Sequence, residues 1–215
     1  MTRKRVAILI SGRGSNMAAL IAAAEADNYP AEIALVLSNR ADAAGLKRAK
    51  DAGIATVTVD HTPYGKDREA FDRAVQAELD AHRIELVCLA GFMRLFSPAM
   101  VARWEARMLN IHPALLPSFK GLRSHARALE AGVKIHGATV HLVAPEVDSG
   151  PIIAQGALAV GEADTAESLE ARVLEIEHRL YPLALKLIAE GRVRVVDGRC
   201  LIAQSQVTKP TLIVP

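Results

Sequence analysis

One Asn and one His stand two positions apart in a short apolar run, Met108-Leu109-Asn110-Ile111-His112. Alternate side chains of a strand point to the same side, so a strand here would place Asn110 and His112 on one face. An Asn amide donates hydrogen bonds to a developing oxyanion without titrating, and a His carries a proton near neutral pH. A buried polar pair satisfied by the backbone explains the same pattern, and both interpretations stay open on this stretch alone.

A carboxylate that could assist this His comes from a later loop. Asp148 lies in Pro145-Glu146-Val147-Asp148-Ser149-Gly150, between two β-rich stretches, 136–144 and 151–160. If the loop folds over the end of the strand that carries His112, Asp148 would orient the imidazole and favour its protonated form. The alternative is a loop Asp that makes an Asx-turn with the residues after it.

Two further His residues belong to the first of these β-rich stretches. His136 and His141 are five residues apart, which places them on opposite faces of a strand, so we do not expect them to bind one metal ion together. His141 alone is expected to be a structural His.

A glycine turn near the N-terminus is suited to binding an anion. Ser11-Gly12-Arg13-Gly14-Ser15-Asn16 follows an apolar strand, 5–10. Glycines allow backbone N–H groups to approach a phosphate closely, and Ser15 and Asn16 are expected to cap the next helix and to face the anion. The turn lacks Gly-Lys-Thr and a third glycine, so it matches neither the Walker nor the dinucleotide pattern. A tight turn with a helix cap is the alternative.

The elements that would position these groups alternate along the chain. Strands are predicted at 5–10, 33–38, 55–59, 86–90 and 108–112, with helices at 17–26, 43–52, 67–82, from 97 or 98 to 108, 123–131 and 166–190. The β-rich stretches 136–144 and 151–160 are expected to pair antiparallel near the sheet edge, and 193–202 to form a hairpin that turns at Asp197-Gly198. The fold class is therefore α/β, a doubly wound, mostly parallel sheet flanked by helices with an antiparallel C-terminal portion. We expect a single domain over 1–200 and a C-terminal tail over 201–215.

Composition limits the partners and the compartment. The net charge of +2 comes from interleaved basic and acidic residues, which does not favour nucleic-acid binding. No apolar run reaches the roughly 18 residues that a membrane span requires. Cys88 and Cys200 form no CxxC pair, and Cys88 lies in an apolar run that favours a buried thiol. We therefore expect a cytoplasmic protein that acts on small molecules, with a homodimer left open.

Five motifs in order resemble one enzyme family. They are Ile-Ser-Gly-Arg-Gly-Ser-Asn (10–16), Gly-Phe-Met-Arg (91–94), Asn-Ile-His-Pro-Ala-Leu-Leu-Pro (110–117), His-Gly-Ala-Thr-Val-His (136–141) and Asp-Ser-Gly-Pro-Ile-Ile (148–153). Together they are similar to phosphoribosylglycinamide formyltransferase, a folate-dependent enzyme of purine synthesis, over about residues 5–197. The resemblance implies a Rossmann-like formyltransferase fold and transfer of a formyl group from 10-formyltetrahydrofolate to the amine of glycinamide ribonucleotide, without a metal.

The resemblance also implies the site residues. Asn110, His112 and Asp148 would form the catalytic trio. Glycinamide ribonucleotide would bind at Gly14, Ser15, Asn16 and Glu177. The folate cosubstrate would bind at Arg68, Met93, Arg94, Leu95, Phe96, Asn110, Ala144, Pro145, Glu146, Val147 and Asp148.

Three residues depart from the family pattern, and three rivals stay open. Leu174 replaces a frequent polar or basic residue, Arg123 a common His and Ala114 a common Ser, which affects peripheral contacts. Formyltetrahydrofolate deformylase resembles the chain in the glycine turn and the trio but passes the formyl group to water. Methionyl-tRNA formyltransferase shares the chemistry but carries an additional tRNA-binding domain. A nucleotide- or folate-binding module without turnover is the non-enzymatic alternative.

Overall fold

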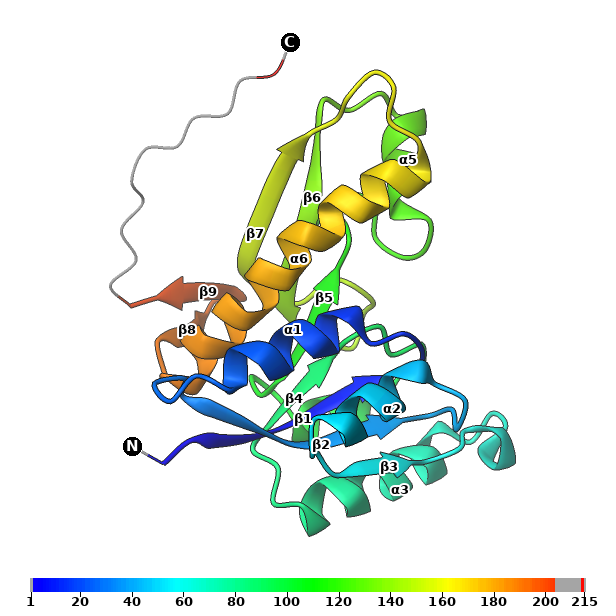
Figure 1. The fold of residues 1–215 in the computed structure, drawn as a ribbon, viewed down its shortest axis with the longest axis vertical. Helices are drawn as coiled ribbons and strands as arrows, with labels where there is room; N and C mark the ends of the chain where they lie inside the picture. The colour runs from blue at the N-terminus through cyan, green and yellow to red at the C-terminus, as the bar shows by residue number, and fades with distance from the viewer. Residues whose placement is uncertain (1, 204–213, 215) are drawn as a thin grey trace. The chain divides into compact units, whose positions relative to one another are not determined.

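A computed structural model describes residues 2–203 and 214 (Figure 1). In this range the larger sheet has the strand order β3-β2-β1-β4-β5-β6-β7, and β8 and β9 pair in a small sheet of their own. This confirms the predicted α/β fold class, with its mostly parallel sheet. The chain divides into two compact units, Met1–Asn110 and Ile111–Pro215.

Parallel strands form the centre of the first unit. Its strands are β1 (Lys4–Ile10), β2 (Ala31–Ser38), β3 (Thr56–Thr58), β4 (Leu86–Leu89) and the first three residues of β5 (Met108–His112). β1 pairs in parallel with β2 and β4, β2 with β3, and β4 with β5. Val6 to Ile10 of β1 are completely buried. A strand covered on both faces needs apolar side chains at every position, which explains the continuous apolar run.

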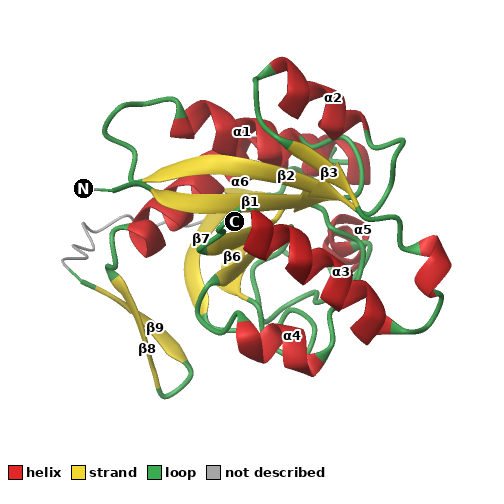
Figure 2. Ribbon diagram, turned by 90° about the horizontal axis from the view of Figure 1, so that it is seen from below, coloured by secondary structure: helices red, strands yellow, loops and turns green. Residues whose placement is uncertain are grey.

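The helices of this unit cover both faces of its strands. They are α1 (Ser15–Ala24), α2 (Ala44–Asp51), the 3₁₀ helix η1 (Thr62–Tyr64), α3 (Arg68–Ala81) and α4 (Pro98–Arg103). Figure 2 shows α1 and α2 on one face of β1–β3 and α3 on the other. The sequence did not predict η1. The prediction that the helix from Ser97 or Pro98 continues to Met108 is wrong, because α4 ends at Arg103 and Ala106 has a φ of 56°, which a right-handed helix does not allow.

An antiparallel pair and a long helix form most of the second unit. Its elements are α5 (Ser124–Glu130), β6 (Ile135–Leu142), β7 (Ile152–Ala159), α6 (Ala166–Ala189), β8 (Val193–Val196) and β9 (Arg199–Ile202). β6 and β7 pair antiparallel, as predicted, and β7 ends the sheet order. α6 lies along both strands in Figure 1. A Cβ on Gly156 of β7 would come within 2.3 Å of Ile176, so glycine permits this close approach of α6.

The C-terminal hairpin is confirmed. β8 and β9 pair antiparallel, and Asp197 and Gly198 have φ values of 48° and 72°, as a type I′ turn requires. Of the predicted tail over 201–215, residues 204–213 and 215 lie outside the described residues. No helix among residues 2–203 has the length and apolar character to cross a membrane.

Candidate active site

Asn110 and His112 lie on β5, where the alternation of a strand gives them a common face. His112 is 5 % exposed and is followed by a turn in which the Ala114 N–H donates to the His112 carbonyl at 2.9 Å. Thr139 of β6 holds that turn. Its hydroxyl donates to the Ala114 carbonyl at 2.7 Å and accepts from the Leu116 N–H at 3.0 Å. The sequence analysis did not single out Thr139. Its hydroxyl fixes the backbone of the loop after His112 through these two hydrogen bonds.

Both ring nitrogens of His112 face acceptor oxygens. Nδ1 lies 3.2 Å from Oδ2 of Asp148, and Nε2 lies 3.0 Å from the carbonyl oxygen of Phe119. A carboxylate and a carbonyl only accept hydrogen bonds, so each nitrogen needs a proton to satisfy its partner. The geometry is therefore that of an imidazolium paired with a carboxylate, and it brings together His112 and Asp148 as the sequence predicted.

Asp148 is fixed from three sides. It is 8 % exposed at its side chain, its Oδ2 also accepts from the Gly121 N–H at 2.8 Å, and its Oδ1 lies 3.7 Å from Nε2 of His141. Burial by itself would raise the pKa of Asp148. The contacts with His141, Gly121 and His112 outweigh burial and hold that pKa below its usual range. Asp148 is therefore an anion that keeps its charge at neutral pH.

The two His residues of β6 have separate surroundings. His141 is buried, and its Nδ1 donates to the Leu142 carbonyl at 2.8 Å, which agrees with the structural His that the sequence predicted; its Nε2 also lies beside Asp148. His136 instead has Nε2 3.3 Å from Nδ1 of His125. Burial first, and the neighbouring His125 second, lower the pKa of His136 to about 4. No group of metal-binding residues occurs in the described part of the chain.

The loop that carries Asp148 is tied to the loop after β5. Nζ of Lys120 lies 3.2 Å from Oε1 of Glu146, beside the bond from Gly121 to Asp148. The predicted folate-binding residues Ala144, Pro145, Glu146 and Val147 precede Asp148 in this loop, with Val147 46 % exposed. Their contact with folate stays a prediction.

The glycine turn borders a pocket in the first unit. The pocket has a volume of about 270 Å³ and is lined by Ser11 to Asn16 together with Ala90, Gly91 and Met93. Gly14 has a φ of 70° and is the N-cap of α1, without a side-chain hydrogen bond. The prediction that Ser15 and Asn16 cap the helix is therefore wrong, since both already lie in its first turn. The turn keeps the form expected of a phosphate site, with backbone N–H groups at a helix N-terminus.

The other predicted binding residues have contrasting exposure. Met93 and Leu95 are 67 % and 53 % exposed, whereas Phe96 is buried and its ring stacks on Phe92 at 5.4 Å. Arg68 is exposed at the first residue of α3. In the second unit, Glu177 is buried on α6 at 6 % exposure. Of the three departures, Ala114 is fully buried, Leu174 is partly exposed on α6, and Arg123 is the exposed N-cap of α5.

Comparison with known proteins shows that the chain is a formyl transferase by family. The model of the formyl transferase family matches residues 4–185. Among relatives, the chain is 52 % identical over 194 residues to the trifunctional purine biosynthetic protein adenosine-3 of Gallus gallus, covering 90 % of this chain but only 19 % of that protein. It therefore spans about a fifth of such trifunctional relatives.

Two shorter proteins define the particular family. The phosphoribosylglycinamide formyltransferase of Escherichia coli is 44 % identical over 193 residues, which cover 90 % of this chain and 91 % of that protein. The crystal structure of glycinamide ribonucleotide transformylase 1 from Symbiobacterium toebii matches with a TM-score of 0.91 and 46 % identity, covering 94 % and 95 % of the two chains. The chain belongs to the phosphoribosylglycinamide formyltransferase family.

Proposed function

We propose that this chain transfers the formyl group of 10-formyltetrahydrofolate to the primary amine of glycinamide ribonucleotide, a step of de novo purine synthesis. The observation that supports this proposal is the buried ion pair of His112 and Asp148, whose charged atoms are 3.2 Å apart. His112 follows Asn110 by two residues on β5, and the chain belongs to this family. The amine attacks the formyl carbon directly, and a tetrahedral intermediate forms and collapses.

Asn110 would stabilise the intermediate. Attack places negative charge on the formyl oxygen, and an amide N–H donates to that oxygen without changing its own protonation. Loss of one such donor typically lowers kcat by about 10²- to 10³-fold, or about 2.7 to 4 kcal/mol. His112 in its imidazolium form supplies a second donor on the same face of β5.

His112 would also move the proton. The attacking amine must lose a proton, and N10 of the folate must gain one before the C–N bond breaks. Asp148 holds Nδ1 of the ring and leaves Nε2 for the reacting atoms, once that nitrogen exchanges the Phe119 carbonyl for substrate or for a water molecule. Because His112 both gives and takes a proton, it ends the cycle as it began, and no covalent enzyme intermediate or metal is required.

The remaining site residues are proposed by their match to the family pattern. Gly14, Ser15 and Asn16, which line the pocket of the first unit, would hold the substrate phosphate, and Glu177 its ribose end. Arg68, the segment Met93–Phe96 and the loop 144–148 would receive the folate. We also propose that residues 1–200 form one formyltransferase domain and that the protein is cytoplasmic. The proposal leaves a homodimer open.

Two alanine substitutions test the assignment. Asn110→Ala and His112→Ala are each expected to lower kcat at least 10²-fold while the affinity for glycinamide ribonucleotide changes little. Asn28→Ala and His82→Ala remove the same side chains from an exposed loop and from the C-cap of α3, and serve as matched controls. Near-wild-type turnover in either site variant would refute the assignment.

The same assay separates the rival functions. Formyl transfer is followed with and without glycinamide ribonucleotide, and formate release is measured in parallel. A deformylase-like enzyme would release formate without the nucleotide, whereas a binding module would bind folate and turn nothing over. The proposal expects formylated nucleotide as the product and little formate.

A further inference from the structure

The segment between Phe92 and Ser97 has irregular backbone and presents exposed side chains. Within the described residues, the backbone N–H and C=O groups of Arg94 and Leu95 have no hydrogen-bond partner. Such a segment has few internal hydrogen bonds that could fix its backbone conformation. Its two ends, however, are bonded to side chains from distant parts of the first unit.

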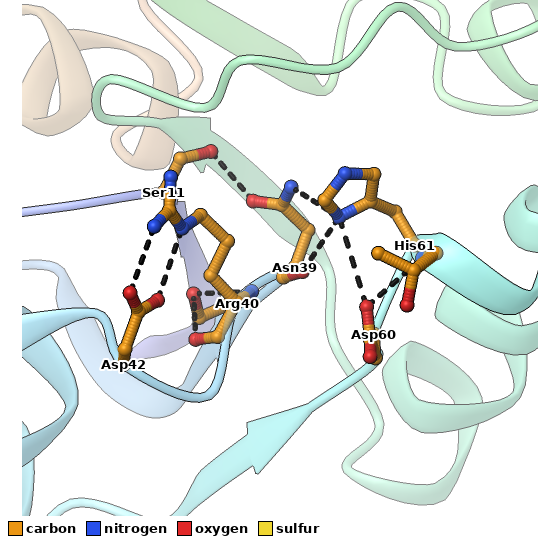
Figure 3. Close-up of polar contacts among 8 residues, drawn as sticks. Ser11, Asn39, Arg40, Asp42, Asp60 and His61 are labelled. Carbon is orange, nitrogen blue, oxygen red and sulfur yellow. Dashed lines mark hydrogen bonds and ion pairs between the residues drawn. The ribbon is translucent and has the colours of Figure 1, made fainter.

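Ser11 holds the first end. The Met93 N–H donates to Oγ of Ser11 at 2.8 Å, and the Ser11 N–H donates to the Gly91 carbonyl at 3.1 Å. The Ser11 hydroxyl in turn donates to Oδ1 of Asn39 at 2.6 Å, as Figure 3 shows. A hydroxyl has one proton, so donation to Asn39 leaves a lone pair for Met93. Asn39 therefore sets the orientation of the group that anchors Met93.

Asn39 is itself well fixed. It is 2 % exposed at the end of β2, and its Nδ2 lies 3.2 Å from Nδ1 of His61, which follows β3 (Figure 3). The network therefore runs across the ends of three neighbouring strands, β3, β2 and β1, before it reaches Met93. Ser11 is also the first residue of the glycine turn, so one residue connects the turn with the Met93–Phe96 segment.

Asp72 holds the second end. The Ser97 N–H donates to Oδ2 of Asp72 at 2.7 Å, and Ser97 then caps α4 through Met100. Asp72 lies on α3 and is 5 % exposed, and its Oδ1 has no partner among the described residues. A buried acceptor with one hydrogen bond depends on that bond, because leaving a buried polar group without a partner costs free energy. The neighbouring Phe71 stacks on Phe92 at 6.4 Å and supports the segment from behind.

We propose that Ser11 and Asp72 are positioning residues that fix the two ends of the Met93–Phe96 segment in its folate-binding shape, with Asn39 orienting the Ser11 hydroxyl. This inference rests on the proposed function, in which the segment receives the folate. It predicts that loss of either anchor weakens folate binding while the chemistry of Asn110 and His112 continues.

The experiment compares alanine and conservative variants at the two anchors. Ser11→Ala and Asp72→Ala are each expected to raise the KM for 10-formyltetrahydrofolate about 2- to 10-fold, the range for one hydrogen bond, with kcat and the KM for glycinamide ribonucleotide within twofold of wild type. Ser11→Thr and Asp72→Asn keep an acceptor oxygen and are expected to restore most of the affinity. Asn39→Ala should change the KM in the same direction as Ser11→Ala.

Matched controls remove similar groups elsewhere in the first unit. Ser38→Ala removes a buried hydroxyl at the end of β2 that bonds to the backbone of Arg40, and Asp80→Ala removes an exposed carboxylate from α3. Both controls are expected to leave the folate KM unchanged. If they raise it as much as the anchor variants do, the effect is general loosening and the proposal is wrong.

Amide hydrogen exchange in the protein without substrates provides the second readout. Exchange at Met93 should become about 2- to 10-fold faster in Ser11→Ala, and exchange at Ser97 in Asp72→Ala. Unchanged exchange together with an unchanged KM in an active enzyme would overturn the anchoring. Failure of the proposed function would differ, because the wild-type protein itself would then transfer no formyl group.

Discussion

Gly150, two residues after Asp148, gives the sharpest test of the link between loop geometry and catalysis. A Cβ built on this buried glycine would lie 1.8 Å from the carbonyl oxygen of Leu142, and 3.3 Å from Cβ of Ala144. Real Cβ contacts essentially never fall below 3.0 Å, so in Gly150→Ala the backbone must move by about 1.2 Å. The Leu142 oxygen belongs to the main chain, so no side-chain rotation relieves the 1.8 Å clash.

The size of the effect follows from where that movement goes. The Leu142 N–H bonds to the Pro151 carbonyl at 2.9 Å, so β6 and the start of β7 resist separation and the loop with Asp148 moves instead. A misplacement of about 1 Å in a catalytic arrangement can cost about 10²-fold in rate. For Gly150→Ala we therefore expect a fall in kcat of about 10²-fold, about 2.7 kcal/mol of barrier, and a loss of about 1 to 3 kcal/mol in the free energy of unfolding.

Steady-state formyl transfer and urea unfolding measure the two effects. Gly161→Ala is the matched control, because its Cβ would meet only the Asp164 carboxylate at 3.4 Å, an ordinary contact, at a glycine without positive φ. The control should keep wild-type kcat and stability. Full activity in Gly150→Ala would refute the reasoning, and lower stability with unchanged kcat would show that the loop position does not govern His112.

Three further predictions concern charge. Asp148→Asn is expected to lower kcat and to change the pH–rate profile, because His112 loses the carboxylate 3.2 Å away; an unchanged profile at full activity would exclude this pairing. His136 has a folded pKa of about 4, below the unfolded value near 6.5, so the unfolded state binds the proton first and stability falls as the pH drops from about 6.5 to 4, by at most about 3 kcal/mol. Urea unfolding at both ends of this range should show that His136→Gln loses less stability than wild type, and an equal loss would contradict the assignment. A chelator should leave formyl transfer unchanged, since the proposed proton path uses side chains only, and a rate restored by added metal would overturn it.

The sequence predicted the parts of the site that depend on local pattern. The apolar run around Asn110 and His112 has the length and alternation of a strand, and Gly12 and Gly14 mark a turn before a helix, so both features were visible in the residues themselves. The placement of Asp148 beside His112 needed the further assumption that a loop folds back, which the structure confirms. Asp148 takes a φ of 50°, a conformation that Asp tolerates better than most residues.

The proximity of His141 to Asp148 could not be predicted from the spacing of the His residues. The spacing of five positions correctly predicted that His136 and His141 lie apart, but the pairing of β6 with β7 shifts register between Val140 and His141. This irregularity lies at the end of β6, next to the loop that places Asp148 beside His112 of β5. A register shift depends on how two strands meet, so a period counted along one strand does not contain it.

The anchors of the Met93–Phe96 segment escaped prediction for a related reason. Ser11 and Met93 are 82 residues apart in the sequence, and Asp72 and Ser97 are 25 apart. Hydrogen bonds from single side chains to the backbone of an irregular segment produce no repeating pattern in the sequence. Each one depends on where one particular strand or helix places one residue. The resemblance to the family predicts which segment binds the folate, whereas the fold is needed to find what holds that segment in place.

The two ring nitrogens of His112 have different partners, and this difference limits how a substrate can reach the ring. Its Nδ1 lies beside Asp148, which the Gly121 N–H and His141 also contact, whereas the partner of its Nε2 among the described residues is the Phe119 carbonyl. Exchanging one acceptor oxygen at Nε2 for another costs little free energy, while breaking a buried ion pair costs several kcal/mol. In the proposed mechanism, an acceptor oxygen of the substrate or of a water molecule can therefore displace Phe119 from Nε2 while Asp148 keeps the ring in place, which is the order of events that a proton carrier needs.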